Sequence, residues 1–143
     1  MAKPIHTVLA FDFGLRQIGV AVGNCLLQTT QPLAIVRARN GQPDWQVLEQ
    51  LVAEWQPDLI VVGDPINMDD SVGESAQRAR KFGRRLHGRF GTPISMTDER
   101  LSSFEAKQTQ RDLGHRGDYK KNPVDSIAAE LILQTWLRES GPA

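Results

Sequence analysis

The chain has 143 residues, with 17 Lys and Arg against 17 Asp and Glu, so its formal net charge is zero. This length fits one domain, residues 1–143, around a single core. Many nucleic-acid-binding proteins are strongly basic, so the zero net charge counts against that function. The only cysteine, Cys25, excludes an internal disulfide and a cysteine-based zinc cluster, and no apolar run is long enough to span a membrane. We therefore expect a cytoplasmic protein with no membrane partner.

The N-terminal half predicts three strands before the first helix. Residues 8–13 and 17–22 are apolar segments separated by a short glycine-bearing turn, which indicates a hairpin. A third strand is expected at residues 33–37. Glycine and proline then separate this strand from an amphipathic helix, with Asp44 as its N-cap and Trp55 near its end.

Strands and helices alternate in the C-terminal half. The apolar run at residues 59–62 predicts a buried strand, and the next helix extends to about Phe90. A strand at residues 94–97 precedes a helix that opens at Ser102, and the last helix reaches Leu137. This order predicts an α/β fold with a mixed, five-stranded central sheet flanked by helices.

The charges are distributed unevenly although their sum is zero. Residues 76–121 contain twelve Lys and Arg but five Asp and Glu, a net charge of +7, and the remainder carries −7. Cationic clusters of this kind are typical of phosphate-binding surfaces. The alternative interpretation is that these cations only form a solvated helix face. On the helix ending near Phe90, Arg80 and Arg84 fall on the flank opposite the candidate phosphate contacts. The candidates are Arg78, Lys81, Arg85 and Arg89 on this helix and Arg116, Lys120 and Lys121 in a later loop.

Four acidic residues stand inside or at the ends of the predicted strands and helices. Asp12 interrupts an apolar strand, where an uncompensated carboxylate costs several kcal/mol. Asp98 and Glu99 end a later strand, and Asp125 lies near the start of the last helix, on its apolar face. A turn residue, a solvated strand end and a helix-capping acid are the alternative interpretations. If Asp12, Glu99 and Asp125 converge, their hard oxygen ligands suit two Mg²⁺ or Mn²⁺ ions about 4 Å apart.

Several of these residues stand in motifs that occur in a fixed order. Taken together, the motifs resemble the YqgF/RuvX family of RNase H-like pre-16S rRNA nucleases, whose members are also described as Holliday junction resolvases. The resemblance covers essentially the whole chain. The motifs are Asp12-Phe-Gly14, Ile18-Gly-Val-Ala21, Gly63-Asp-Pro-Ile-Asn-Met-Asp69, Arg78-Ala-Arg-Lys-Phe82, Thr97-Asp-Glu-Arg-Leu-Ser102 and Val124-Asp-Ser-Ile-Ala-Ala129.

The resemblance implies an RNase H-like sheet whose first three strands are antiparallel. It carries catalytic and metal-binding roles to Asp12, Glu99 and Asp125, with Asp98 as a weaker candidate ligand. Arg16 and Arg100, which lie within or beside the motifs, join the candidate phosphate contacts.

Two positions depart from the family pattern. Members often have leucine where this chain has Asp64, so we expect that carboxylate either to perturb metal binding or to face solvent. They also often have a Lys-Arg pair where this chain has Arg16-Gln17, so this chain has a cation at one of the two positions expected to contact phosphate.

The combined features predict a metal-dependent endonuclease that acts on structured nucleic acid. The preferred substrate is the 5′ end of the 16S rRNA precursor, with the ribosomal small subunit as partner and the protein a monomer or weak homodimer. A Holliday junction resolvase acting on branched DNA and a non-catalytic rRNA- or junction-binding factor are the alternatives. Acids beside a cationic track repel phosphate unless a metal is bound, so the three carboxylates favour catalysis. An actin-like sugar kinase is disfavoured because such kinases pair two domains of this size.

Overall fold

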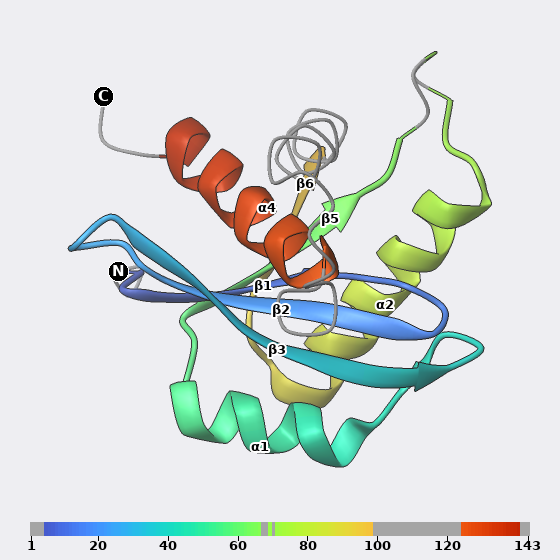
Figure 1. Ribbon diagram of the computed structural model, residues 1–143, viewed down its shortest axis with the longest axis horizontal. Helices are drawn as coiled ribbons and strands as arrows, with labels where there is room; N and C mark the ends of the chain where they lie inside the picture. Colours follow the sequence, from blue (N-terminus) through green and yellow to red (C-terminus); the bar gives the residue numbers. More distant parts are fainter. Residues whose placement is uncertain (1–4, 67–68, 70, 99–123, 141–143) are drawn as a thin grey trace, which may run out of the picture.

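The computed structural model describes residues 5–66, 69, 71–98 and 124–140. Three antiparallel strands begin the fold, and two further strands extend the sheet parallel to the first (Figure 1). The spatial order is β4-β3-β2-β1-β5-β6, which confirms the predicted mixed sheet. The main strands are β1 (Thr7–Asp12), β2 (Gln17–Asn24), β3 (Thr29–Arg39), β5 (Leu59–Asp64) and β6 (Ile94–Asp98).

The prediction of five strands is wrong by one short strand, β4 (Gln42–Pro43). Asn40 and Gly41 have φ values of 50° and 81°, and they form a two-residue turn that pairs Arg39 with Gln42. Asn-Gly is the sequence most typical of such a hairpin turn, because both central residues need positive φ. The glycine therefore closes a hairpin before the helix begins.

Strand β3 is also longer than the predicted residues 33–37. Its pairing with β2 shifts between Val20–Ala34 and Ala21–Pro32, which leaves Leu33 as an extra residue. Pro32 has no N–H to donate, and prolines inside sheets are found at irregularities of this kind. The bulge lets the strand continue beyond the proline to Thr29.

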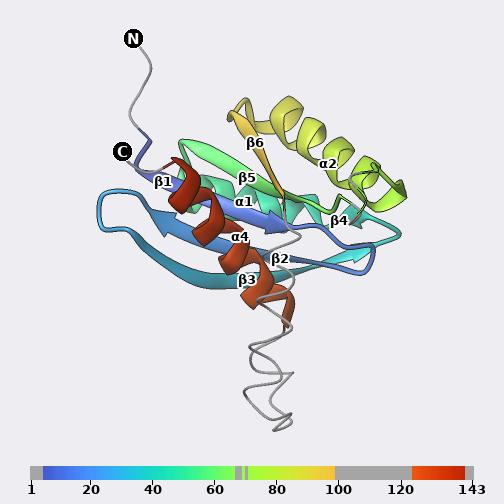
Figure 2. The same cartoon turned by 90° about the horizontal axis from the view of Figure 1, so that it is seen from above.

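Helices cover both faces of the sheet. Helices α1 (Trp45–Trp55) and α2 (Glu74–Phe90) lie on one face and α4 (Val124–Ser140) lies on the other (Figure 2). Asp44 is the N-cap of α1 as predicted, although its side chain makes no capping hydrogen bond. None of the helices in the described ranges has the length and apolar composition that a membrane crossing requires. The helix predicted from Ser102 lies outside the described residues.

Strand alternation divides the core into two clusters, one on each face. Leu9 and Phe11 of β1 pack with Leu48 of α1 and Phe82 of α2. The intervening Val8 and Ala10 pack in the second cluster with Ala129, Ile132 and Leu133 of α4. Successive side chains of a strand point to opposite faces. The two clusters therefore also tell which face of the sheet is occupied by the side chain at the end of each strand.

Candidate active site and nucleic-acid interface

Asp12 is the last residue of β1, at the carboxyl end of that strand. Val8 and Ala10 face the α4 layer, so the period of two places Asp12 on the same face. Its side chain is half-buried and borders a shallow pocket formed by the β1–β2 turn, residues 13–17. The carboxylate that interrupts the apolar strand is thus at the rim of an accessible pocket, with Arg16 on the same turn.

The turn beside Asp12 requires glycine at position 14. A Cβ atom on Gly14 would lie 2.5 Å from the backbone carbonyl oxygen of Gln17, closer than real Cβ contacts allow. A backbone atom cannot move aside without changing the turn itself. The glycine of the Asp12-Phe-Gly14 motif is therefore explained by the close return of the chain into β2.

Asp64 and Asp98 end the two neighbouring parallel strands and are partners in the register of β5 and β6. Val62 and Met96, two residues earlier in each strand, pack in the cluster under α1 and α2. Alternation consequently places both aspartates on the α2 face, opposite the face of Asp12. Although the three aspartates share one edge of the sheet, the pleat separates Asp12 from the other two.

Asp64 does not face solvent, contrary to one of the two expectations for it. Its side chain is buried, and Arg80 of α2 donates hydrogen bonds to both of its carboxylate oxygens. These hydrogen bonds, together with the negative charge of Asp64, raise the pKa of the Arg80 guanidinium. The Asp64 carboxylate is therefore paired with Arg80, on the sheet face opposite Asp12.

Several of the predicted site residues are not tested by the structure. The backbone of Asp125 lies in the first turn of α4, whose beginning lies over the half of the sheet where β1 ends (Figures 1 and 2). Among the described residues, no three His, Cys, Asp or Glu side chains are grouped closely enough to hold a metal ion. The predicted residues that lie outside the described ranges are Glu99, Arg100, Arg116, Lys120 and Lys121.

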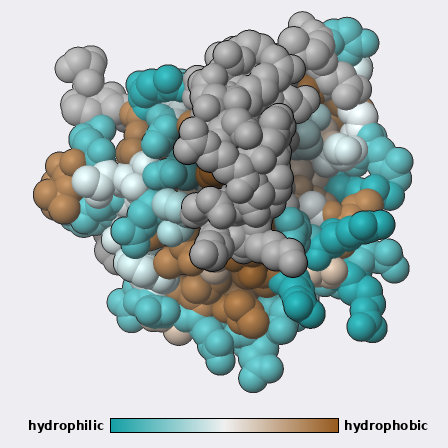
Figure 3. All heavy atoms as spheres, viewed as in Figure 1, coloured by the Kyte–Doolittle hydropathy of each residue, from teal (hydrophilic) through white to brown (hydrophobic). Residues whose placement is uncertain are grey.

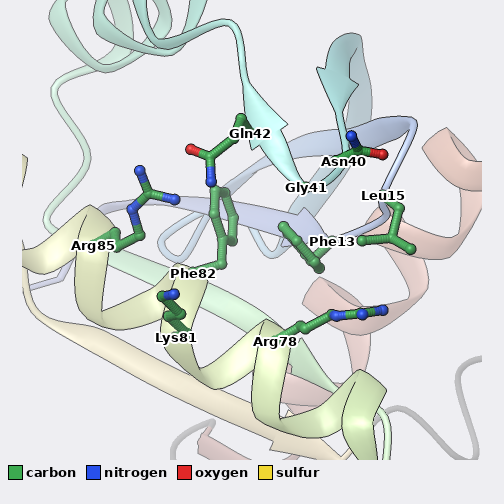
Figure 4. Close-up of a pocket in the computed structure, with 9 residues that line it drawn as sticks. All are labelled: Phe13, Leu15, Asn40, Gly41, Gln42, Arg78, Lys81, Phe82 and Arg85. Carbon is green, nitrogen blue, oxygen red and sulfur yellow. The ribbon is translucent and has the colours of Figure 1, made fainter.

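The cationic side chains of α2 are arranged on two flanks, as the helical period predicts. Arg80 and Arg84 line a pocket against β6, whereas Arg78, Lys81 and Arg85 line a different pocket beside the β3–β4 turn (Figure 4). In the view of Figure 3, hydrophilic side chains dominate the side of the molecule where α2 lies. The helix is therefore half buried and still presents cations on both sides of its apolar stripe.

Besides Arg80, three arginines of α2 are held by neighbouring groups. Arg78 forms an ion pair with Glu74 one turn earlier, and Arg89 pairs with Glu49 of α1 at 3.1 Å. The guanidinium carbons of Arg85 and Arg89 lie 5.2 and 4.2 Å from the centroid of the Trp45 ring. A cation over an indole face is stabilised by the ring quadrupole. Trp45 thus orients part of the cationic flank, a role that the amphipathic pattern of α1 did not reveal.

The family model described as "RuvX: Holliday junction resolvase" matches residues 6–139. The chain belongs to the RuvX family. A relative from Chromohalobacter salexigens is 56% identical over 132 residues, covering 92% of this chain and 89% of its own. One from Saccharophagus degradans is 50% identical over 137 residues, covering 96% of each chain. Both carry the name "Putative pre-16S rRNA nuclease".

Solved structures share the fold of this RuvX family member. RuvC of T. thermophilus in complex with a Holliday junction substrate aligns with a TM-score of 0.53 at 14% identity, over 94% of this chain and 96% of that chain. The fowlpox virus Holliday junction resolvase aligns with a TM-score of 0.55 at 15% identity, over 94% and 98%. These likenesses confirm the RNase H-like fold. Family membership makes the chain a nuclease, a hydrolase that acts on ester bonds.

Proposed function

We propose that this nuclease cleaves phosphodiester bonds in a metal-dependent reaction and that it processes the 5′ end of the 16S rRNA precursor. The observation that carries the proposal is the position of Asp12, half-buried at the carboxyl end of β1 and bordering an open pocket. The names of relatives that are 50–56% identical to this chain support the choice of substrate. A cytoplasmic location follows from that substrate.

The donor chemistry of the proposed site fits a divalent metal. Asp12 supplies a hard carboxylate oxygen on the α4 face, and Asp125 belongs to the first turn of the helix on that face. Glu99 directly follows Asp98 in the chain, and we assign it the third carboxylate. The α2-face position of Asp98 makes it the less suitable partner for Asp12. Carboxylates at these positions would hold Mg²⁺ or Mn²⁺, which would supply activation of a water molecule and stabilisation of the leaving oxygen.

The other residues of the chain bind and orient the substrate in this proposal. Arg16 lines the pocket that Asp12 borders, and we assign its guanidinium to a phosphate next to the cleaved bond. Lys81 and Arg85 of α2 extend the cationic surface away from Asp12, and Arg100, Arg116, Lys120 and Lys121 are assigned to the same track. The positive charge of the track offsets the repulsion between the catalytic carboxylates and the substrate phosphates.

A Holliday junction resolvase is the second candidate, and the fold supports it. Two of the structural neighbours are resolvases solved with junction DNA. A resolvase must cut two strands symmetrically and therefore needs two copies of the site, whereas trimming of an RNA end requires one. We infer a monomer or weak homodimer that acts on the ribosomal small subunit precursor. The third candidate is a factor that binds rRNA without cleaving it. Of the three functions, this is the one in which the Asp12 carboxylate would have no catalytic role.

A paired cleavage assay separates these candidates. Equal concentrations of a 16S precursor fragment and a four-way DNA junction are incubated with the protein and Mn²⁺, and products are mapped at nucleotide resolution. We expect a defined cut near the mature 5′ end of the RNA and slower or no cleavage of the junction. Symmetrical junction cleavage with intact RNA would favour the resolvase. Binding of both without any cut would favour the non-catalytic factor.

A further inference from the structure

A pocket of about 330 Å³ lies between α2 and the β3–β4 turn, on the sheet face opposite α4 (Figure 4). Its aromatic side is formed by Phe13 and Phe82, whose ring centroids are 5.0 Å apart with the planes tilted by 36°. Phe82 is only 2% exposed and Phe13 is half-buried, so Phe13 presents the more accessible of the two rings.

The charges around this pocket favour an anionic ligand. Arg78, Lys81 and Arg85 are three and four residues apart on α2, so they project from one side of the helix and all line the pocket, with Arg78 and Arg85 at its two ends and Lys81 between them (Figure 4). Glu74 partly balances Arg78, and the Trp45 ring holds Arg85, but no carboxylate of the described residues pairs with Lys81. Like charges around one cavity repel each other, and a bound phosphate relieves that repulsion.

The remaining walls suit a heterocyclic base. An aromatic ring offers a stacking surface that accepts any base, and the amide side chains of Asn40 and Gln42 can donate and accept hydrogen bonds. Gly41 brings the turn close to Phe13, because a Cβ there would lie 3.2 Å from the Phe13 Cζ atom. The volume is at the small end of the range for ligand pockets, roughly 300–1,000 Å³, which suits one nucleotide rather than a duplex.

The pocket adjoins the proposed active site through the β1–β2 turn. Phe13 and Leu15 line both this pocket and the shallow pocket that Asp12 borders. Asp12 and Phe13 are consecutive, so one nucleic-acid strand crossing the turn can reach both. Arg16 stands on the same turn and offers a phosphate contact between the two places.

We propose that this pocket binds one unpaired nucleotide of the substrate strand, with its base against Phe13 and its phosphate on Lys81 and Arg78. The proposal rests on the proposed function in one respect, because it places this nucleotide beside the bond that is cleaved at Asp12. It gives the enzyme a means to select single-stranded or distorted positions. A regular duplex keeps its bases stacked and cannot fill the pocket.

Equilibrium binding in EDTA tests the pocket without cleavage. Fluorescence anisotropy compares three labelled RNAs: a blunt duplex, the same duplex with a short unpaired tail, and a duplex whose tail carries abasic nucleotides. Stacking of one base on an aromatic ring corresponds to roughly a 5- to 150-fold gain in affinity. We expect the tailed duplex to bind within that range more tightly than the blunt one, and the abasic tail to lose most of the gain.

Variants assign the preference to the pocket. Lys81→Ala removes an exposed cation, and Phe13→Leu keeps an apolar side chain but removes the ring, so each is expected to reduce the ratio of tailed to blunt affinity at least about fivefold. Arg84→Ala is the matched control, because Arg84 lies on the other flank of the same helix. It lowers all affinities alike and leaves the ratio unchanged. An unaltered ratio in both Lys81→Ala and Phe13→Leu would overturn the proposal.

Two further comparisons distinguish failure of the pocket proposal from failure of the proposed nuclease reaction. Equal affinity of the wild type for the base-containing and abasic tails overturns the pocket even if Mn²⁺-dependent cleavage is observed. A tail preference that depends on Lys81 and Phe13 supports the pocket even if no cleavage occurs, and then only the proposed nuclease reaction fails. Adenosine 5′-monophosphate serves as competitor, and its displacement of the tail at equimolar concentration would assign the pocket to a free nucleotide instead of the substrate strand.

Discussion

Arg80 of α2 and Asp64 of β5 form a forked ion pair on the sheet face opposite Asp12. Nε of Arg80 donates to both carboxylate oxygens at 3.2 Å, and Nη2 donates to Oδ2 at 2.8 Å. The Asp64 residue is 6% exposed, so its charge needs a partner, and the motif at residues 78–82 supplies one. The aspartate that departs from the family pattern is thereby accommodated without entering the proposed metal site.

Breaking this pair from the arginine side should destabilise the protein. Arg80→Ala leaves the buried Asp64 carboxylate without its guanidinium, whereas the double variant Asp64→Leu/Arg80→Ala removes both charges. We expect the double variant to be closer to the wild type in its free energy of unfolding than Arg80→Ala is, as measured by urea denaturation. Arg84→Ala, on the other flank, should change that free energy by less than about 0.5 kcal/mol. Additive effects of the two substitutions would show that the pair is not coupled.

The sheet was largely predictable, because continuous apolar runs such as Val8 to Phe11 are typical of a strand that is buried on both faces. The short strand at Gln42 was missed although Asn40-Gly41 is a strong hairpin signal, since the glycine was interpreted only as a break before α1. The ion pair of Asp64 was not predictable, because nothing in the linear sequence says which helix packs over β5. The same holds for Trp45, which meets Arg85 and Arg89 only through the packing of α1 beside α2.

The cations of the pocket flank should determine part of the salt dependence of RNA binding. Replacing Arg78, Lys81 and Arg85 together by alanine leaves up to three phosphates without a cationic partner, so fewer counterions are released on binding. We expect the slope of log affinity against log salt concentration to decrease by about one for each phosphate that is no longer neutralised. Arg89, which is engaged by Glu49 and Trp45, should contribute less. An unchanged slope in the triple variant would mean that this flank is only a solvated helix face.

Gly14→Ala should damage the site more than the fold. The added Cβ would meet the Gln17 carbonyl oxygen at 2.5 Å, so the β1–β2 turn must change its path beside Asp12. We expect cleavage to decrease at least about tenfold while far-ultraviolet circular dichroism stays unchanged, since displacement of a reactive group by about 1 Å can cost roughly 100-fold in rate. Wild-type cleavage by Gly14→Ala would show that the exact turn is unimportant.

Cys25 should react slowly with alkylating reagents. Partial burial, and then the negative charge of Asp58, raise the pKa of its thiol, so less thiolate is present near pH 8.5 than in the unfolded chain. We expect slower alkylation by iodoacetamide in buffer than in denaturant at that pH. The raised pKa also makes the free energy of unfolding depend on pH. The contribution of Cys25 to that free energy is complete below the pKa of the thiol in the unfolded chain, and it is lost as pH rises through the pKa of the thiol in the folded protein. Equal alkylation rates in the two states would contradict the shift.

Mn²⁺-dependent cleavage of a 16S precursor fragment by wild type and Asp12→Asn, purified in parallel, tests whether Asp12 takes part in the reaction. The amide removes one carboxylate charge at the end of β1 and keeps the size of the side chain. We predict a loss of roughly 100-fold or more in cleavage rate, the scale expected when one electrostatic group is removed, with RNA affinity in EDTA largely retained. Chelation by EDTA should abolish cleavage by the wild type. Equal Mn²⁺-dependent cleavage by the two proteins would show that Asp12 does not belong to the catalytic metal site.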